Sequence, residues 1–153
     1  MKKSIFDVLG PHPEPSDLTA FSRNALARDS EHRDETSLQK ALAVEGTHIL
    51  AFCDAKLVLK HDGAVLDPLF APYELAELSP DFDNAVLLGF QPTGEPRIAV
   101  PVHCPADDLA GHYKPADARA LFRDRLVGDD LAGEAAQALS LLRWNADNRF
   151  CGR

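Results

Sequence analysis

Short apolar runs separated by turn residues occupy the middle of the chain. Residues 47–53 and 56–60 are apolar and partly β-branched, and they flank a two-residue Asp-Ala turn at 54–55. A further short run, 64–66, follows an Asp-Gly pair at 62–63. Runs of this length bounded by turn residues are typical of strands. The pattern therefore predicts a small antiparallel meander.

A second pair of apolar runs predicts another hairpin. Residues 84–90 and 97–102 flank the turn-rich segment 91–95, which contains proline and glycine. Pro101 has no amide donor, so it favours an edge position or the end of strand pairing.

A short helix is predicted just before the first strand. Thr36 or Ser37 can cap it, and it should end near Gly46. Its apolar residues fall on one helical face: Leu38, Ala41 and Leu42.

The C-terminal third of the chain has helical spacing. After an expected loop over 103–114, Pro115 suits the first position of a helix that continues to about Gly128. A last helix should start at Asp129 or Asp130, and its apolar stripe should pack on the sheet or on another subunit. Hairpins followed by helices indicate an α+β fold with a small antiparallel or mixed sheet. The stripe consists of Leu131, Ala135, Ala138, Leu139, Leu142 and Ala146.

Composition indicates one acidic globular domain. The 153 residues are 45% hydrophobic and 26% charged, and their formal net charge is −8. A chain of this length holds a core without covalent cross-links. The charge argues against a dedicated nucleic-acid-binding module and against adsorption to anionic lipid. No apolar run has the length of a membrane span.

The cysteines favour a reducing compartment. Cys53, Cys104 and Cys151 are an odd number at wide spacing, with no Cys-x-x-Cys pair. We therefore expect free thiols, and we expect the protein to be cytoplasmic.

The end of the chain resembles a known junction. An Ala/Leu-rich helix leads to Trp144, a polar stretch and then Arg-Phe-Cys-Gly at 149–152. This resembles the NADH pyrophosphatase family of Nudix hydrolases, in which Arg-Phe-Cys-Gly-x-Cys-Gly opens a zinc ribbon. Further segments look like that family's N-terminal segment, paired strands and pre-junction helix: 21–33, 87–90, 96–100 and 117–121.

The resemblance implies a domain organisation and a function. Residues 1–20 would be an irregular Pro-rich arm, 21–150 the N-terminal Nudix-like domain and 151–153 the start of a zinc ribbon. Family members are implied to cleave the pyrophosphate of NAD(H) to nicotinamide mononucleotide and AMP as homodimers, and some also remove NAD caps from RNA. Their structural zinc and their catalytic magnesium or manganese would lie in the intact protein, with no cofactor in this chain.

The catalytic signature of that family is absent from this sequence. It reads Gly-x5-Glu-x7-Arg-Glu-x-x-Glu-Glu-x-Gly, because hard carboxylate oxygens must hold the divalent cation. The glutamates here include no Glu-Glu and no Arg-Glu pair, so we expect these residues alone not to hydrolyse pyrophosphate. They lie at positions 14, 31, 35, 45, 74, 77, 95 and 134.

Three residues are candidate site residues. Cys151 corresponds to the first zinc ligand of the ribbon, although a single thiolate cannot hold zinc. Arg119 matches a basic position that is implied to reach the bound dinucleotide, where its guanidinium would bind a phosphate. Its alternative is a solvated arginine paired with Asp117 or Asp124. Lys60 is a weaker substrate candidate, whose alternative is a strand-end lysine that discourages edge pairing.

Other interpretations of the site and of the function stay open. His103, Cys104 and His112 could ligate zinc in a small metalloenzyme, although their spacing fits no named site and a plain loop is the simpler interpretation. A free-standing interaction domain without an enzymatic role is the main alternative to the family function. Trp144 is expected to anchor the end of the last helix in the core or at an interface. With Leu142, it predicts self-association through an incompletely covered stripe.

Overall fold

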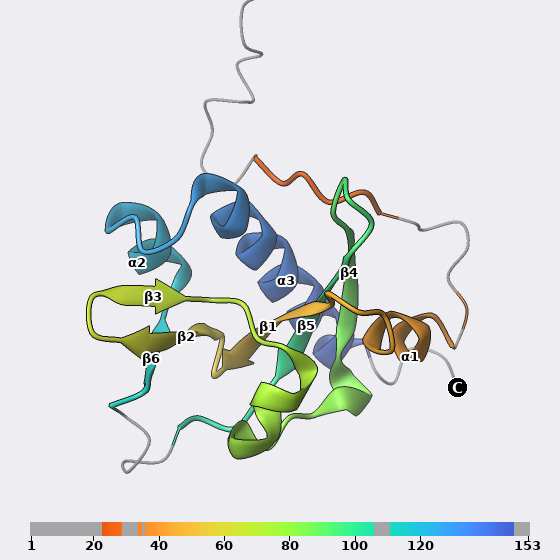
Figure 1. The fold of residues 1–153 in the computed structure, drawn as a ribbon, viewed down its shortest axis with the longest axis horizontal. Helices are drawn as coiled ribbons and strands as arrows, with labels where there is room; N and C mark the ends of the chain where they lie inside the picture. The colour runs from red at the N-terminus through yellow and green to blue at the C-terminus, as the bar shows by residue number, and fades with distance from the viewer. Residues whose placement is uncertain (1–22, 29–33, 35, 106–110, 149–153) are drawn as a thin grey trace, which may run out of the picture.

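A mixed sheet of six strands forms the centre of the molecule (Figure 1). The computed structural model describes residues 23–28, 34, 36–105 and 111–148. The Pro-rich arm and the Arg-Phe-Cys-Gly junction expected from the sequence lie outside these residues. In chain order the strands are β1 (His48–Cys53), β2 (Lys56–Asp62), β3 (Val65–Asp67), β4 (Val86–Phe90), β5 (Pro96–Pro101) and β6 (Tyr113–Ala116).

Both predicted hairpin regions are confirmed. β1, β2 and β3 form an antiparallel meander, and the turn at 54–55 joins Cys53 to its partner Lys56. β4 and β5 form the second antiparallel hairpin, with an irregular register between Leu87 and Gly89.

A parallel pairing that the sequence pattern did not reveal joins the two hairpins. β1 and β5 lie side by side from His48↔Arg97 to Phe52↔Pro101, so the order of the sheet is β3-β2-β1-β5-β4. Pro101 is the last paired residue of β5, which agrees with the expected end of pairing, although the amide of Val102 just beyond it still donates to the carbonyl of Phe52.

The expected loop at 103–114 extends two residues too far, and the expected helix from Pro115 to about Gly128 is too long at both ends, because it spans Ala118–Arg123. Residues 113–116 form β6, in which Pro115 lies opposite Val58 of β2. Leu57 pairs with both β1 and β6, so β6 lies on the side of β2 away from β1, at the edge of the sheet where a proline is tolerated. The helix begins later because Asp117 caps it, accepting a hydrogen bond of 2.7 Å from the amide of Ala120.

Helices cover both faces of the sheet (Figure 1). α1 begins after Thr36, and α3 begins at Asp129, as expected. Two corrections concern α3: Ala146 is exposed, and Glu134, which is not part of the predicted stripe, is buried. The helices are α1 (Ser37–Leu42), α2 (Ala118–Arg123) and α3 (Asp129–Asp147), with 3-10 helices η2 (Pro72–Leu78) and η3 (Phe82–Asn84).

The core is divided between the two faces of the sheet. In β1, Ile49 and Ala51 pack on the side of α1 and η2, and Leu50 and Phe52 pack on the side of α2 and α3. Because both faces are covered, β1 is a continuous apolar run rather than an alternating one. The α+β fold class is confirmed. None of the helices in the described part of the chain is long and apolar enough to cross a bilayer.

Candidate functional site

Arg119 lies on the exposed side of α2. Neither expected ionic partner pairs with it: Asp117 caps the helix, and both oxygens of Asp124 accept hydrogen bonds from Arg123. Within the described residues the guanidinium of Arg119 has no ion pair. Phe122, which is 48% exposed, lies three residues further along, on the same helical face. α2 therefore presents a cation beside an aromatic ring.

Lys60 has a different environment. Its ammonium nitrogen lies 3.0 Å from a carboxylate oxygen of Asp67 and 3.1 Å from one of Glu74, and it lies 5.2 Å from the ring centroid of Phe70. Burial alone would lower the pKa of Lys60, but the hydrogen bonds and charges of the two carboxylates outweigh it and raise the pKa. The lysine is charged and already matched by two anions.

The alternative interpretation of Lys60, a strand-end lysine that discourages edge pairing, is wrong. At Lys60, β2 pairs with Asp67 of β3 and with Tyr113 of β6, so this position is not at an edge. Glu74 reaches it from η2, where the same carboxylate accepts the amide of Ala71 at 2.6 Å. The contact between Glu74 and Lys60 could not be predicted from hydrophobic periodicity, because Glu74 lies in a short 3-10 helix in a proline-containing segment.

A pocket of about 410 Å³ opens beside Lys60, among side chains that carry polar groups. The Tyr113 hydroxyl donates a hydrogen bond of 3.3 Å to Glu77. Burial and the charge of Glu77 raise the pKa of Tyr113, so its hydroxyl stays protonated. The pocket is lined by Lys60, His61, Asp62, Glu77, His112 and Tyr113.

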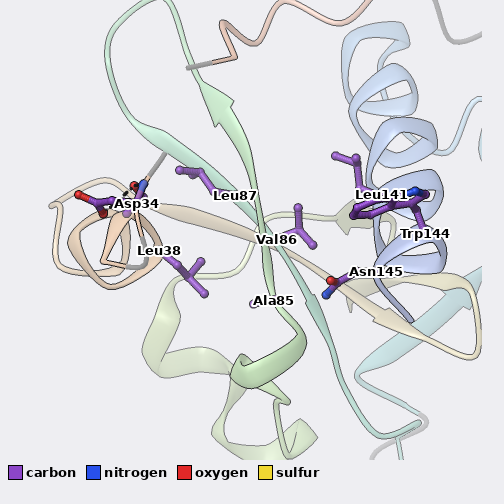
Figure 2. A pocket seen from close by; sticks show the side chains of 9 residues that line it. Asp34, Leu38, Ala85, Val86, Leu87, Leu141, Trp144 and Asn145 are labelled. Atoms are coloured by element: carbon purple, nitrogen blue, oxygen red, sulfur yellow. Dashed lines mark hydrogen bonds between the residues drawn. The ribbon is translucent and has the colours of Figure 1, made fainter. Parts of the chain in front are cut away.

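A second hollow, of about 260 Å³, lies between α1, β4 and α3 (Figure 2). We call it the β4 groove. Its floor is the start of β4, and α1 and the last turns of α3 form its walls. Asp34 at its rim accepts hydrogen bonds from Thr36, which with those from Lys40 and Ser37 hold the pKa of its carboxyl far below the usual range. The groove is lined by Asp34, Ser37, Leu38, Ala85, Val86, Leu87, Leu141, Trp144 and Asn145.

Trp144 is the one exposed apolar residue among those that line this groove. The residue lies on α3 and is 64% exposed, so of the two expected positions the core is wrong and the interface stays a prediction. Leu142, by contrast, packs against the buried cluster beneath α3. The two residues that the sequence grouped together thus have different environments: Leu142 is partly buried, and Trp144 is exposed.

The expectation of free thiols is wrong for two of the three cysteines. Cys53 and Cys104, which are 51 residues apart in the sequence, form a disulfide with their Cα atoms 5.0 Å apart. The parallel pairing of β1 and β5 brings their chain segments together, and nothing in the cysteine spacing indicated that pairing. With its sulfur in the bridge, Cys104 supplies no thiolate to the zinc site considered for His103 and His112.

The described residues provide no metal centre. Among them, no group of three or more His, Cys, Asp or Glu side chains could hold an ion. Cys151 lies outside the described residues. A four-ligand zinc site that uses Cys151 would therefore need at least one further ligand from outside the described residues.

Two comparisons with known proteins place this geometry in context. A family model described as "NADH pyrophosphatase-like rudimentary NUDIX domain" matches residues 46–144. The match runs from just before β1 to the last turns of α3, and it includes Lys60, Arg119 and Trp144. No curated protein matches the chain.

Proposed function

Because the chain belongs to the NADH pyrophosphatase-like rudimentary NUDIX domain family, we propose that it is the N-terminal, non-catalytic domain of a Nudix hydrolase. That enzyme would cleave the pyrophosphate of NAD(H) to nicotinamide mononucleotide and AMP, and NAD-capped RNA is a second candidate substrate. The family match over residues 46–144 carries the proposal, together with a sequence that has no Nudix glutamate signature. The domain would complete the substrate pocket and assemble a homodimer.

The exposed face of α2 supports the first role. A guanidinium that is not neutralised by a carboxylate suits a phosphate oxygen, and an adjacent ring suits a base or nicotinamide plane. Arg119 and Phe122 supply both groups. Lys60 would be a secondary contact, because a phosphate would have to compete there with Asp67 and Glu74.

The β4 groove supports the second role. Apolar surface rimmed by polar groups is typical of interfaces, and an aromatic side chain is a frequent anchor in them. Trp144 provides such an anchor at the end of α3. Salt screens the repulsion between two chains of charge −8 beyond about 8 Å at physiological strength.

Incubation of the purified chain with NADH and magnesium or manganese tests the non-catalytic assignment. We expect no AMP above that of a heat-killed control, because the metal-binding glutamates are absent. Release of AMP in proportion to the amount of folded chain would reject the assignment.

Sedimentation of wild type and Trp144→Ser tests the dimer role. We expect wild type to dimerise at tens of micromolar in 0.15 M salt and Trp144→Ser to weaken the dimer about tenfold or more, as loss of an interface anchor does. Tyr73→Ser is a matched control, because Tyr73 is 81% exposed and lies outside the β4 groove. Monomeric wild type, or equal weakening by both variants, would remove the support for this interface.

Arg119→Ala in the intact enzyme tests the pocket role. Loss of a charged hydrogen bond to phosphate costs about 1.5–3 kcal/mol, so KM for NADH should rise roughly tenfold or more. Arg143→Ala is the control, because Arg143 is also exposed but pairs with Asp147 on α3. An unchanged KM would exclude Arg119 from the substrate site.

The main alternative is a free-standing interaction domain without enzymatic partners. The coding sequence that follows Arg153 separates the two: Cys-Gly, a second cysteine pair and a Nudix signature support the enzyme. The structural zinc and the catalytic magnesium or manganese are proposed for the intact enzyme and not for this chain. A cytoplasmic location stays a prediction, which microscopy of a tagged chain would check.

A further inference from the structure

The Cys53–Cys104 bridge lies at the C-terminal ends of two neighbouring strands, β1 and β5. Cys53 is the last residue of β1 and is buried, whereas Cys104 follows β5 by three residues and is exposed. One sulfur of the bridge is therefore accessible to a thiol from solution.

Backbone hydrogen bonds hold the two cysteines together independently of the bridge. The amide of Val102 donates to the carbonyl of Phe52 at 2.8 Å, and the amide of His103 donates to the carbonyl of Leu78 at 2.9 Å. These bonds fix the backbone on the N-terminal side of both cysteines. Opening the bridge should therefore leave both sulfurs within reach of each other, without unfolding of the sheet.

The surroundings of the two sulfurs suit a pair of neutral thiols as well as a bridge. The Cys104 sulfur lies 3.2 Å from a carboxylate oxygen of Asp54, which would accept the proton of a Cys104 thiol. Cys53, by contrast, is buried in the apolar cluster on the α1 side of the sheet. The reduced state would thus keep a hydrogen bond at the exposed sulfur and an apolar environment at the buried one.

We propose that Cys53 and Cys104 form a reversible thiol–disulfide switch, a property that goes beyond the proposed function. Closed, the bridge fastens the chain after β5 to the end of β1; open, that attachment depends on hydrogen bonds alone. A thiolate of a dithiol reductant attacks the Cys104 sulfur, and the Cys53 sulfur leaves and takes up a proton. The second thiol of the reductant then displaces Cys104, so two electrons and two protons reach the protein and the reductant becomes a disulfide.

Reduction without unfolding distinguishes a switch from a permanent cross-link. A bridge that maintains the fold is buried or reducible only after unfolding, and its loss abolishes structure. A switch is accessible, and both of its states are folded. In reducing compartments, disulfides are usually transient or redox-sensing, so such a switch is also compatible with the expected cytoplasmic location.

Thiol labelling of Cys151→Ser, which leaves only this pair, tests the proposal. The variant is equilibrated with glutathione disulfide or with dithiothreitol, in both cases without denaturant, then labelled with N-ethylmaleimide under denaturing conditions and weighed. We expect no label after the first treatment and two labels after the second, with unchanged far-ultraviolet circular dichroism. A bridge that dithiothreitol opens only in denaturant, or two free thiols after glutathione disulfide, would overturn it.

Amide hydrogen exchange tests whether the two states differ. Opening the bridge should speed exchange at Val102 and His103 by about tenfold or more, because a cross-link of this loop length contributes more than the 1.4 kcal/mol of a tenfold change. The amide of Phe90, which bonds Ala27 at the far edge of the sheet, is the internal control. Cys104→Ser should reproduce the fast exchange with or without reductant. Equal exchange rates at Val102 and His103 in the oxidised and reduced states would show that the bridge does not change the local structure, and would overturn the proposed switch.

Discussion

Arg97 of β5 and Glu134 of α3 form an ion pair in the interior, between the sheet and the helix that covers it. The Arg97 Nε lies 2.9 Å from a carboxylate oxygen of Glu134, and the two side chains are 7% and 1% exposed. The other oxygen of Glu134 accepts a hydrogen bond of 3.0 Å from Gln91. The charged atoms attract at short range but are not aligned as a hydrogen bond, and Nη1 of Arg97 has no partner among the described residues.

Removing one member of this pair should be costly, and removing both should not. Glu134→Leu or Arg97→Met alone should lower the free energy of unfolding by about 3–5 kcal/mol, because each leaves an uncompensated buried charge. The double variant should lose less than either single variant, since the desolvation cost disappears with both charges. Urea denaturation of the four proteins measures the coupling. Additive losses would show that the two charges do not depend on each other.

Glu134 should also make stability depend on pH. Burial raises the pKa of Glu134, and the attraction of Arg97 only partly opposes this. The ordinary pKa of a glutamate carboxyl is about 4.5. As pH rises above this value, Glu134 loses its proton in the unfolded chain before it does so in the folded protein. Stability attributable to this group is therefore highest at low pH and falls as pH rises through its raised pKa.

The difference between wild type and Glu134→Gln isolates this effect. Asp34, Glu95 and Asp124 have lowered pKa values, so their contributions are lost only as pH falls, below the same range. Thermal melts between pH 4.5 and 7 should show wild type losing stability relative to Glu134→Gln. A constant difference across this range would contradict the raised pKa.

The turn between β1 and β2 uses a conformation that its residues disfavour. Asp54 and Ala55 have φ values of 45° and 61°, as a tight hairpin turn requires. Ala55→Gly should therefore raise the free energy of unfolding by roughly 1 kcal/mol, because glycine adopts this region without a Cβ clash. Ala71→Gly is the matched control: at φ −72° it should lower stability by about 0.4–1 kcal/mol. Chemical denaturation that ranks the two variants in the opposite order would contradict the strained turn.

Gly89 allows the segment before α1 to lie against β4. A Cβ at Gly89 would come within 2.5 Å of the carbonyl oxygen of Ala27, whose backbone exchanges two hydrogen bonds of 2.9 Å with Phe90. Gly89→Ala should thus displace that segment and cost about 1–3 kcal/mol. Gly111→Ala, where a Cβ meets no atom within 4 Å, should be nearly neutral. Proteolysis near Ala27 and urea denaturation measure both; equal stability of the two variants would contradict the close contact.

Local sequence signals determined the elements with short-range causes. Turn residues at 54–55 and 91–95 separate apolar runs, and hairpins form from neighbouring segments, so both hairpins could be predicted. The start of α3 could be predicted as well, because helical spacing and acidic residues at 129 and 130 mark it. The family could be recognised from the residues that carry its junction and its paired strands.

Tertiary structure alone decided the contacts between distant segments. The parallel pairing of β1 with β5 depends on how two hairpins dock, and with it came the bridge between Cys53 and Cys104. The partners of Lys60 and the burial of Glu134 likewise depend on elements far apart in the chain. Such contacts leave no periodic pattern in the sequence. Their energy comes from burial and charge pairing between segments that meet only when the chain folds.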